Sequence, residues 1–164
     1  MHQVSYNIMV NLLMKYPHTA GRVLDVGSYN VNGTYKPMFG SGYKYEGLDI
    51  AAGPNVDIVT TDPYKWPIED NIYDLVISGS CMEHVEAPWL WIQEVYRVCK
   101  PGGLCVILAP WASGEHRHPV DCWRVLPDGM RYLLGTHIKL EVLEVGLNKA
   151  DANYIGDCWG VGRK

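Results

Sequence analysis

Acidic and small residues follow two short apolar segments near the start of the chain. Asp25, Gly27 and Ser28 come at the end of the run Arg22–Val26, and Asp49 closes the next apolar segment. A glycine directly after a buried strand lets the backbone approach a ligand closely, and an acid about 20 residues further on suits the hydroxyl groups of a ribose. This spacing predicts a site for a nucleoside-type cofactor.

The densest mixture of ionisable and aromatic residues lies further along, between residues 110 and 124. His116 or His118 could serve as a general base, because imidazole titrates near neutral pH. The same two histidines and Asp121 could instead bind a metal ion, but we favour the first interpretation and predict no metal. Arg124 could pair with Asp121 or with a carboxylate of a substrate. His84 is predicted either to face the pocket or to be a hydrogen-bonded edge residue.

Short apolar runs alternate with turns and helical segments, which predicts a mostly parallel sheet covered by helices. The predicted strands are Val23–Val26, Tyr43–Leu48, Val56–Thr60, Leu75–Ser78, Leu104–Ala109, Lys139–Val145 and Tyr154–Val161. Ligands of an open parallel sheet bind beyond the carboxyl ends of its strands. The polar and small residues after the first four strands should therefore meet at one edge.

Three helices are predicted around this sheet. Apolar residues at helical spacing predict an amphipathic helix that ends before Pro17. The segment Trp89–Cys99 is expected to be a crossover helix that stops at the turn Lys100–Gly103, and Gly129–Leu134 is expected to be a short helix.

The composition narrows the class of protein. A length of 164 residues predicts a single domain over residues 1–164, and a net charge of −4 without a basic cluster argues against a nucleic-acid partner. Five cysteines without a C-x-x-C pair favour a reducing, cytoplasmic location. Neither a signal peptide nor an apolar run of about 20 residues is seen, so no membrane association is expected.

Taken together, these motifs resemble the class I S-adenosylmethionine-dependent methyltransferases, of the small single-domain, methyltransferase type 11-like kind. The segments that carry the resemblance, in order, are Val23–Gly27, Gly47–Ile50, Asp74–Ser78, Glu83–Val85 and Arg97–Gly103. The resemblance implies an α/β, Rossmann-like, doubly wound sheet of seven mostly parallel strands, the last antiparallel, with helices on both faces. It also implies in-line transfer of a methyl group from S-adenosyl-L-methionine to an O, N or C atom of a small-molecule acceptor.

The same resemblance assigns roles to individual residues. Gly27 would approach the methionine part of the cofactor, Asp49 would accept hydrogen bonds from the ribose, and Asp62 would meet the adenine amino group. The full set implied to bind the cofactor is Asp25, Gly27, Ser28, Tyr29, Asp49, Ile50, Thr61, Asp62, Pro63, Ser80, Met82 and Glu83. A further pattern is similar to a motif of one uncharacterised branch and comprises His116, Pro119, Asp121, Trp123, Arg124, Pro127 and Gly129.

One departure from the family pattern concerns the turn after Asp25. Tyr29 and Val31 stand where the usual turn carries glycines, so Ser28, Tyr29 or Asn30 could hold the cofactor's carboxylate. Two alternative functions stay open. The short acceptor region is compatible with a non-catalytic cofactor-binding module, completed by a second copy or a partner protein. An NAD-dependent oxidoreductase is the other, although the full G-x-G-x-x-G is missing.

Overall fold

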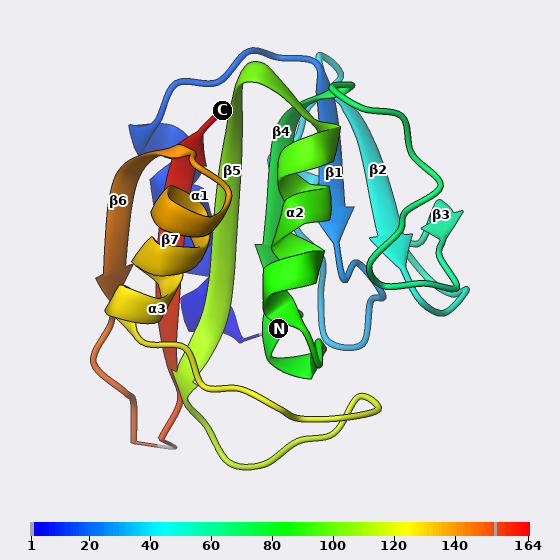
Figure 1. The fold of residues 1–164 in the computed structure, drawn as a ribbon. Coiled ribbons are helices and arrows are strands. Elements are labelled where there is room, and N and C mark those ends of the chain that lie inside the picture. The colour runs from blue at the N-terminus through cyan, green and yellow to red at the C-terminus, as the bar shows by residue number, and fades with distance from the viewer. Residues whose placement is uncertain (1, 153) are drawn as a thin grey trace.

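The computed structural model describes residues 2–152 and 154–164, and its described strands form one sheet (Figure 1). The strands are β1 (Arg22–Val26), β2 (Lys44–Asp49), β3 (Ile58–Val59), β4 (Tyr73–Gly79), β5 (Cys99–Ala112), β6 (Glu141–Leu147) and β7 (Gly156–Arg163). Their order is β3-β2-β1-β4-β5-β7-β6. The first five are mutually parallel, whereas β7 is antiparallel to both of its neighbours. The predicted seven-stranded, mostly parallel sheet with an antiparallel last strand is confirmed.

Helices cover both faces of the sheet. Figure 1 shows α2 (Pro88–Val98) and α3 (Pro127–Arg131) on one face and α1 (Gln3–Lys15) on the other. Alternate residues of β4 face opposite sides, so Leu75 and Ile77 pack with the α1 cluster while Val76 packs with the α2 cluster. The helices expected before Pro17 and at Trp89–Cys99 are confirmed, and the third starts at Pro127 and continues as the π-helix η3 (Tyr132–His137).

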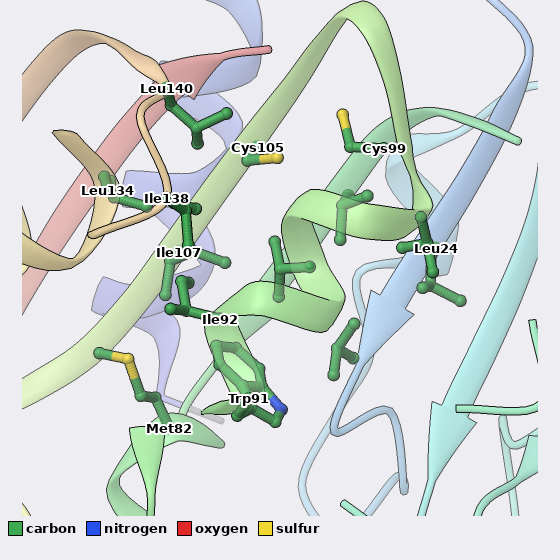
Figure 2. Packing of buried hydrophobic residues seen from close by; sticks show 14 of the residues in the cluster. Leu24, Met82, Trp91, Ile92, Cys99, Cys105, Ile107, Leu134, Ile138 and Leu140 are labelled. Atoms are coloured by element: carbon green, nitrogen blue, oxygen red, sulfur yellow. The ribbon is translucent and has the colours of Figure 1, made fainter. Parts of the chain in front are cut away.

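The centre of the sheet is buried on both faces. Residues Leu104–Ala109 of β5 are at most 1% exposed, which explains why this strand is a continuous apolar run and not an alternating one. Figure 2 shows Trp91 and Ile92 of α2 packed with Met82 and Ile107 in this core. This rigid core carries the strand ends and the loops that follow them.

Several elements differ from the sequence-based expectation. The strand expected at Val56–Thr60 is only the two-residue β3. The Val56 amide donates to the Gly53 carbonyl oxygen in the preceding turn, whereas the Asp57 and Thr60 amides still donate to β2. The turn expected at Lys100–Gly103 lies inside β5, where Gly102 has a φ of +79° and the register with β4 shifts. Within the described residues, the connections from β1 through β4 carry only the 3₁₀ turn η1 (Lys36–Met38) and no α-helix.

No helix in the described part of the chain is both long enough and apolar enough to cross a membrane.

Candidate functional site

A cavity of about 850 Å³ lies beyond the carboxyl ends of the parallel strands. Residues that follow each of β1, β2, β3, β4 and β5 line it, as the topology of an open parallel sheet requires. Residues from α1's amino end and from the start of β7, such as His2 and Asp157, complete the wall. The fold thus brings segments from the whole chain to one pocket.

The turn after β1 forms one wall of the cavity. Gly27 has a φ of +79°, and a Cβ atom there would lie 2.5 Å from Cys81 Sγ, so both the backbone conformation and the space require glycine. The amides of Gly27 and Ser28 both donate to the Leu48 carbonyl oxygen, at 2.9 and 3.1 Å. Ser28 is 5% exposed and its Oγ has no hydrogen-bond partner among the described residues.

Two carboxylates stand at the ends of β1 and β2. Asp49 accepts hydrogen bonds from the amides of Tyr29 at 3.0 Å and Ile50 at 2.7 Å, which fixes its orientation. Oδ1 also accepts the Ala51 amide at 3.3 Å, so Oδ2 is the oxygen that retains a lone pair for a further donor. Asp25 is 3% exposed and accepts a hydrogen bond from the Tyr45 hydroxyl. Burial raises the pKa of Asp25 to about 7, despite the opposing effect of that hydrogen bond.

Most of the predicted site residues line this cavity. They are Asp25, Gly27, Ser28, Tyr29, Asp49, Ile50, Thr61, Pro63, Ser80, Glu83, His116 and His118. Two predicted residues are not among the lining residues. Asp62 instead accepts a hydrogen bond from the Tyr64 amide at 2.8 Å, and Met82 is fully buried in the core beside α2 (Figure 2).

Glu83, on the 3₁₀ turn η2 (Met82–His84), is the most unusual residue of the cavity. Its side chain is fully buried, and neither carboxylate oxygen has a hydrogen-bond partner among the described residues. His84 Nε2 lies 3.6 Å and His116 Nε2 lies 3.7 Å from Glu83 Oε1. This carboxylate raises the pKa of His116 above its usual value. The two imidazole rings meet edge to face, with centroids 5.0 Å apart.

The loop after β5 is held in place by the residues of the His-x-x-Pro-x-Asp-x-Trp-Arg pattern. Asp121 accepts a hydrogen bond from the His116 amide at 2.8 Å and forms a two-pronged ion pair with Arg124 at 2.6 and 2.8 Å. Arg124 holds the pKa of Asp121 well below its usual range. The Trp123 indole donates to the Val85 carbonyl oxygen at 2.8 Å. Arg124 therefore pairs with Asp121, one of the two partners considered from the sequence. The Trp123 hydrogen bond attaches the loop to the end of η2.

Sequence reasoning missed several aromatic and hydroxyl side chains of the cavity. These include Tyr35, Thr60, Tyr64, Trp66 and Trp91. Tyr35 is 4% exposed, its hydroxyl has no partner among the described residues, and it contacts the position where a Cβ of Gly79 would lie. No spacing rule connects Tyr35 to the distant Gly79, so only the three-dimensional structure brings them together.

The cavity fits a nucleoside-containing cofactor. Gly27 leaves room where any side chain would fill the turn, and Ser28 Oγ is a buried group that lacks a partner. Asp49 supplies a half-buried carboxylate at the second strand end, where ribose hydroxyls are commonly bound. The size of the cavity, about 850 Å³, allows a cofactor and a small second ligand together.

Comparisons with known proteins agree with this description. Residues 24–107 match the family model of a methyltransferase domain, known as methyltransferase type 11. An uncharacterised methyltransferase of Mycobacterium leprae is 35% identical over 113 residues, which cover 58% of this chain and 41% of that protein. A demethylmenaquinone methyltransferase of Renibacterium salmoninarum is 29% identical over 107 residues, which cover 60% of this chain and 42% of that protein. The chain thus spans less than half the length of these two relatives.

Among solved structures, a SAM-dependent methyltransferase from Aquifex aeolicus has a TM-score of 0.64 at 20% identity. The matched region covers 93% of this chain and 88% of the Aquifex chain. At this identity the likeness concerns the fold. Since the family model matches about half of the chain, the family itself is shown. The chain belongs to the class I S-adenosylmethionine-dependent methyltransferases, in the methyltransferase type 11 family.

Proposed function

We propose that this chain binds S-adenosylmethionine in the cavity and transfers its methyl group to an oxygen, nitrogen or carbon atom of a small molecule. The observation that carries the proposal is that one cavity joins two different sets of residues. Gly27 and Asp49 follow β1 and β2, whereas Glu83, His84 and His116 follow β4 and β5. The first set suits a nucleoside cofactor and the second set suits an acceptor.

In the cofactor half, the proposed contacts come from the first three strand ends. Asp49 would bind the ribose hydroxyls, the Gly27 turn would border the methionine part, and Ser28 Oγ would find the partner that it lacks in the protein. Thr61 and Pro63, which line the cavity after β3, would border the adenine. Asp62 and Met82 are left out of this proposal because they do not line the cavity.

In the acceptor half, positioning is expected to dominate the chemistry. The sulfonium cofactor supplies an activated methyl group, so the protein must mainly align the acceptor and exclude water. His116 is half buried and His118 is exposed at the cavity wall, and either imidazole could accept a proton from a hydroxyl or amine acceptor. Because the pKa of His116 is raised, its neutral, basic form requires a higher pH than an ordinary histidine does.

The acceptor is proposed to be a small, partly aromatic molecule. Tyr35 lies against Gly79 at the end of β4 and contributes aromatic surface to the cavity. The similarity to a demethylmenaquinone methyltransferase supports a ring-shaped acceptor for this chain as well. The formal charge of −4, without a basic cluster, supports a small molecule over a nucleic acid.

The proposal is tested by methyl transfer from radiolabelled S-adenosylmethionine to a panel of hydroquinones, phenols and small amines. We expect turnover with at least one acceptor class and its loss in Asp49→Ala. Cofactor binding without turnover on any acceptor would instead favour the non-catalytic module. Binding of NAD in place of S-adenosylmethionine would favour the oxidoreductase.

A further inference from the structure

The Glu83 carboxylate is a buried acidic group that faces two imidazoles. It is fully buried, and neither oxygen has a hydrogen-bond partner among the described residues. Burying an unpaired carboxylate costs several kcal/mol, so buried charges are normally paired or bound to a cation. The residues that face Glu83 Oε1 within 4 Å and could supply a positive charge are His84 and His116.

The hydrogen bonds made by Nδ1 determine which tautomer each of the two imidazoles adopts when it is neutral. His84 Nδ1 lies 2.6 Å from the Val120 carbonyl oxygen, and His116 Nδ1 lies 3.0 Å from the Gly114 carbonyl oxygen. Because a carbonyl oxygen can only accept, each Nδ1 must carry the proton. In the neutral rings the lone pair is therefore on Nε2, the atom that faces Glu83. A metal-binding histidine commonly donates its other ring N–H to a backbone carbonyl in this way.

The loop that carries His116 is itself held by a second layer of contacts. Arg124 donates to the Gly114 carbonyl oxygen at 3.0 Å, and Asp121 accepts the His116 amide at 2.8 Å. The amides of Cys122 and Trp123 both donate to the Glu83 carbonyl oxygen, at 2.8 and 3.2 Å. These contacts fix the positions of Glu83 and His116 relative to each other.

The separations of the three side chains match those around a small metal ion. A tetrahedral ion with bonds of about 2.1 Å places its ligand atoms about 3.4 Å apart. The two nitrogen-to-oxygen distances are 3.6 and 3.7 Å, and the three ligand atoms all lie within 4.8 Å of one another. A small inward movement of the half-buried imidazoles would complete the site.

We propose that Glu83, His84 and His116 bind a divalent transition-metal ion, such as zinc, with a coordination position open to the cavity. Two imidazoles and one carboxylate are a ligand set suited to zinc and its first-row neighbours, whereas magnesium and calcium prefer oxygen ligands. Three protein ligands with one open position are typical of a zinc ion that also binds a small molecule. This set differs from the grouping of His116, His118 and Asp121 considered from the sequence.

The open position gives the ion a use in the acceptor half of the cavity. In the sheet, β4 lies between β1 and β5, and the segments after all three strands line the cavity, so the ion would lie near the proposed cofactor. It would bind and orient an acceptor through an oxygen atom, such as a hydroxyl or carbonyl oxygen. This use rests on the proposed methyl transfer, but binding of the metal does not. With the ion bound, His118 is the imidazole that stays free to act as a base.

The experiment measures zinc binding to the metal-free protein by calorimetry and metal analysis, without any methyl donor. We expect one equivalent per chain and no comparable binding of magnesium. Glu83→Gln and His116→Gln should each raise the Kd for zinc by at least about 100-fold, since even outer-shell partners are worth 10- to 100-fold. Cobalt should give the intense visible absorption of a four-coordinate ion in the wild type, and this absorption should disappear in both variants.

Two control variants make the result specific. His18→Gln removes an imidazole whose Nδ1 also faces a backbone carbonyl, that of Tyr16 at 3.0 Å, but which does not line the cavity, and it should bind zinc as the wild type does. Cys122→Ser tests the exposed thiol in the loop that carries His116. The proposal is overturned if zinc does not bind, if folded His116→Gln retains the wild-type Kd, or if binding is lost only in Cys122→Ser. Binding of S-adenosylhomocysteine, measured separately, reports on the proposed function independently of zinc.

Discussion

At the scale of single residues, the Asp25 carboxyl group makes stability depend on pH. Burial raises its folded-state pKa to about 7 from 3.8, so folding favours the protonated acid. That stabilisation is complete below about pH 4 and is lost as the pH rises through about 7, a change of about 4 kcal/mol. We expect the free energy of unfolding of Asp25→Asn to fall less over this range than that of the wild type. Urea unfolding at several pH values measures the difference, and parallel curves for the two proteins would contradict it.

Asp62 provides a test of the residue roles that the family resemblance implies. Its carboxylate accepts the Tyr64 amide and does not line the cavity, although the resemblance assigns it to the adenine. We therefore expect Asp62→Ala to leave the Kd for S-adenosylhomocysteine within about twofold of the wild type, a difference below about 0.5 kcal/mol. Calorimetry measures this Kd, and a tenfold loss would support the role that the resemblance implies.

At the scale of elements, the turn after β1 requires glycine for two reasons that can be separated. Gly27→Ala combines a positive φ with a contact to Cys81 Sγ at 2.5 Å, whereas Gly102→Ala has the same φ of +79° but nothing within 4 Å of its Cβ. We expect Gly102→Ala to cost about 1 kcal/mol of stability and Gly27→Ala to cost at least about 2 kcal/mol. Chemical denaturation of the two variants measures both costs, and equal costs would show that the contact with Cys81 is relieved without strain.

Helix α1 is joined to β7 by one buried hydrogen bond. Ser5 Oγ donates to Asp157 Oδ2 at 2.6 Å, and both residues are at most 3% exposed. Ser5→Ala leaves the buried carboxylate without this donor, and we expect a loss of about 1–3 kcal/mol. Gln3→Ala, which removes an exposed side-chain bond to Asn7 from the same helix, should change stability by less than about 0.5 kcal/mol. Thermal or urea unfolding compares the two, and similar losses would contradict the account.

The sequence predicted the elements better than the loops between them. The apolar runs at β1 and β5 are buried on both sides, so their composition alone identifies them as central strands. The ends of the short strand β3 were harder to predict, because two residues give too little pattern to define them. Glu83 and His116 meet because η2 and the loop after β5 are tied together through backbone bonds. Such pairing between residues distant in sequence leaves no periodic signal.

At the scale of the whole molecule, we propose that residues 1–164 form a single domain. The two apolar clusters lie on opposite faces of the same sheet and share strands β4 and β5, so neither should melt alone. We expect one cooperative transition in calorimetry. S-adenosylhomocysteine at 100 times its Kd should stabilise the folded state by about 2.7 kcal/mol and raise the Tm by about 5–10 °C. Two separate transitions would contradict the single domain.

The measurement that tests the central claim most directly is calorimetric titration of the wild type and Asp49→Ala with S-adenosylhomocysteine, with NAD as the comparison ligand. The account predicts saturable binding of S-adenosylhomocysteine, no binding of NAD, and a loss of at least tenfold, or about 1.4 kcal/mol, in the variant. Binding that Asp49→Ala leaves unchanged would contradict the placement of the cofactor. Binding of NAD alone would contradict its identity in this chain.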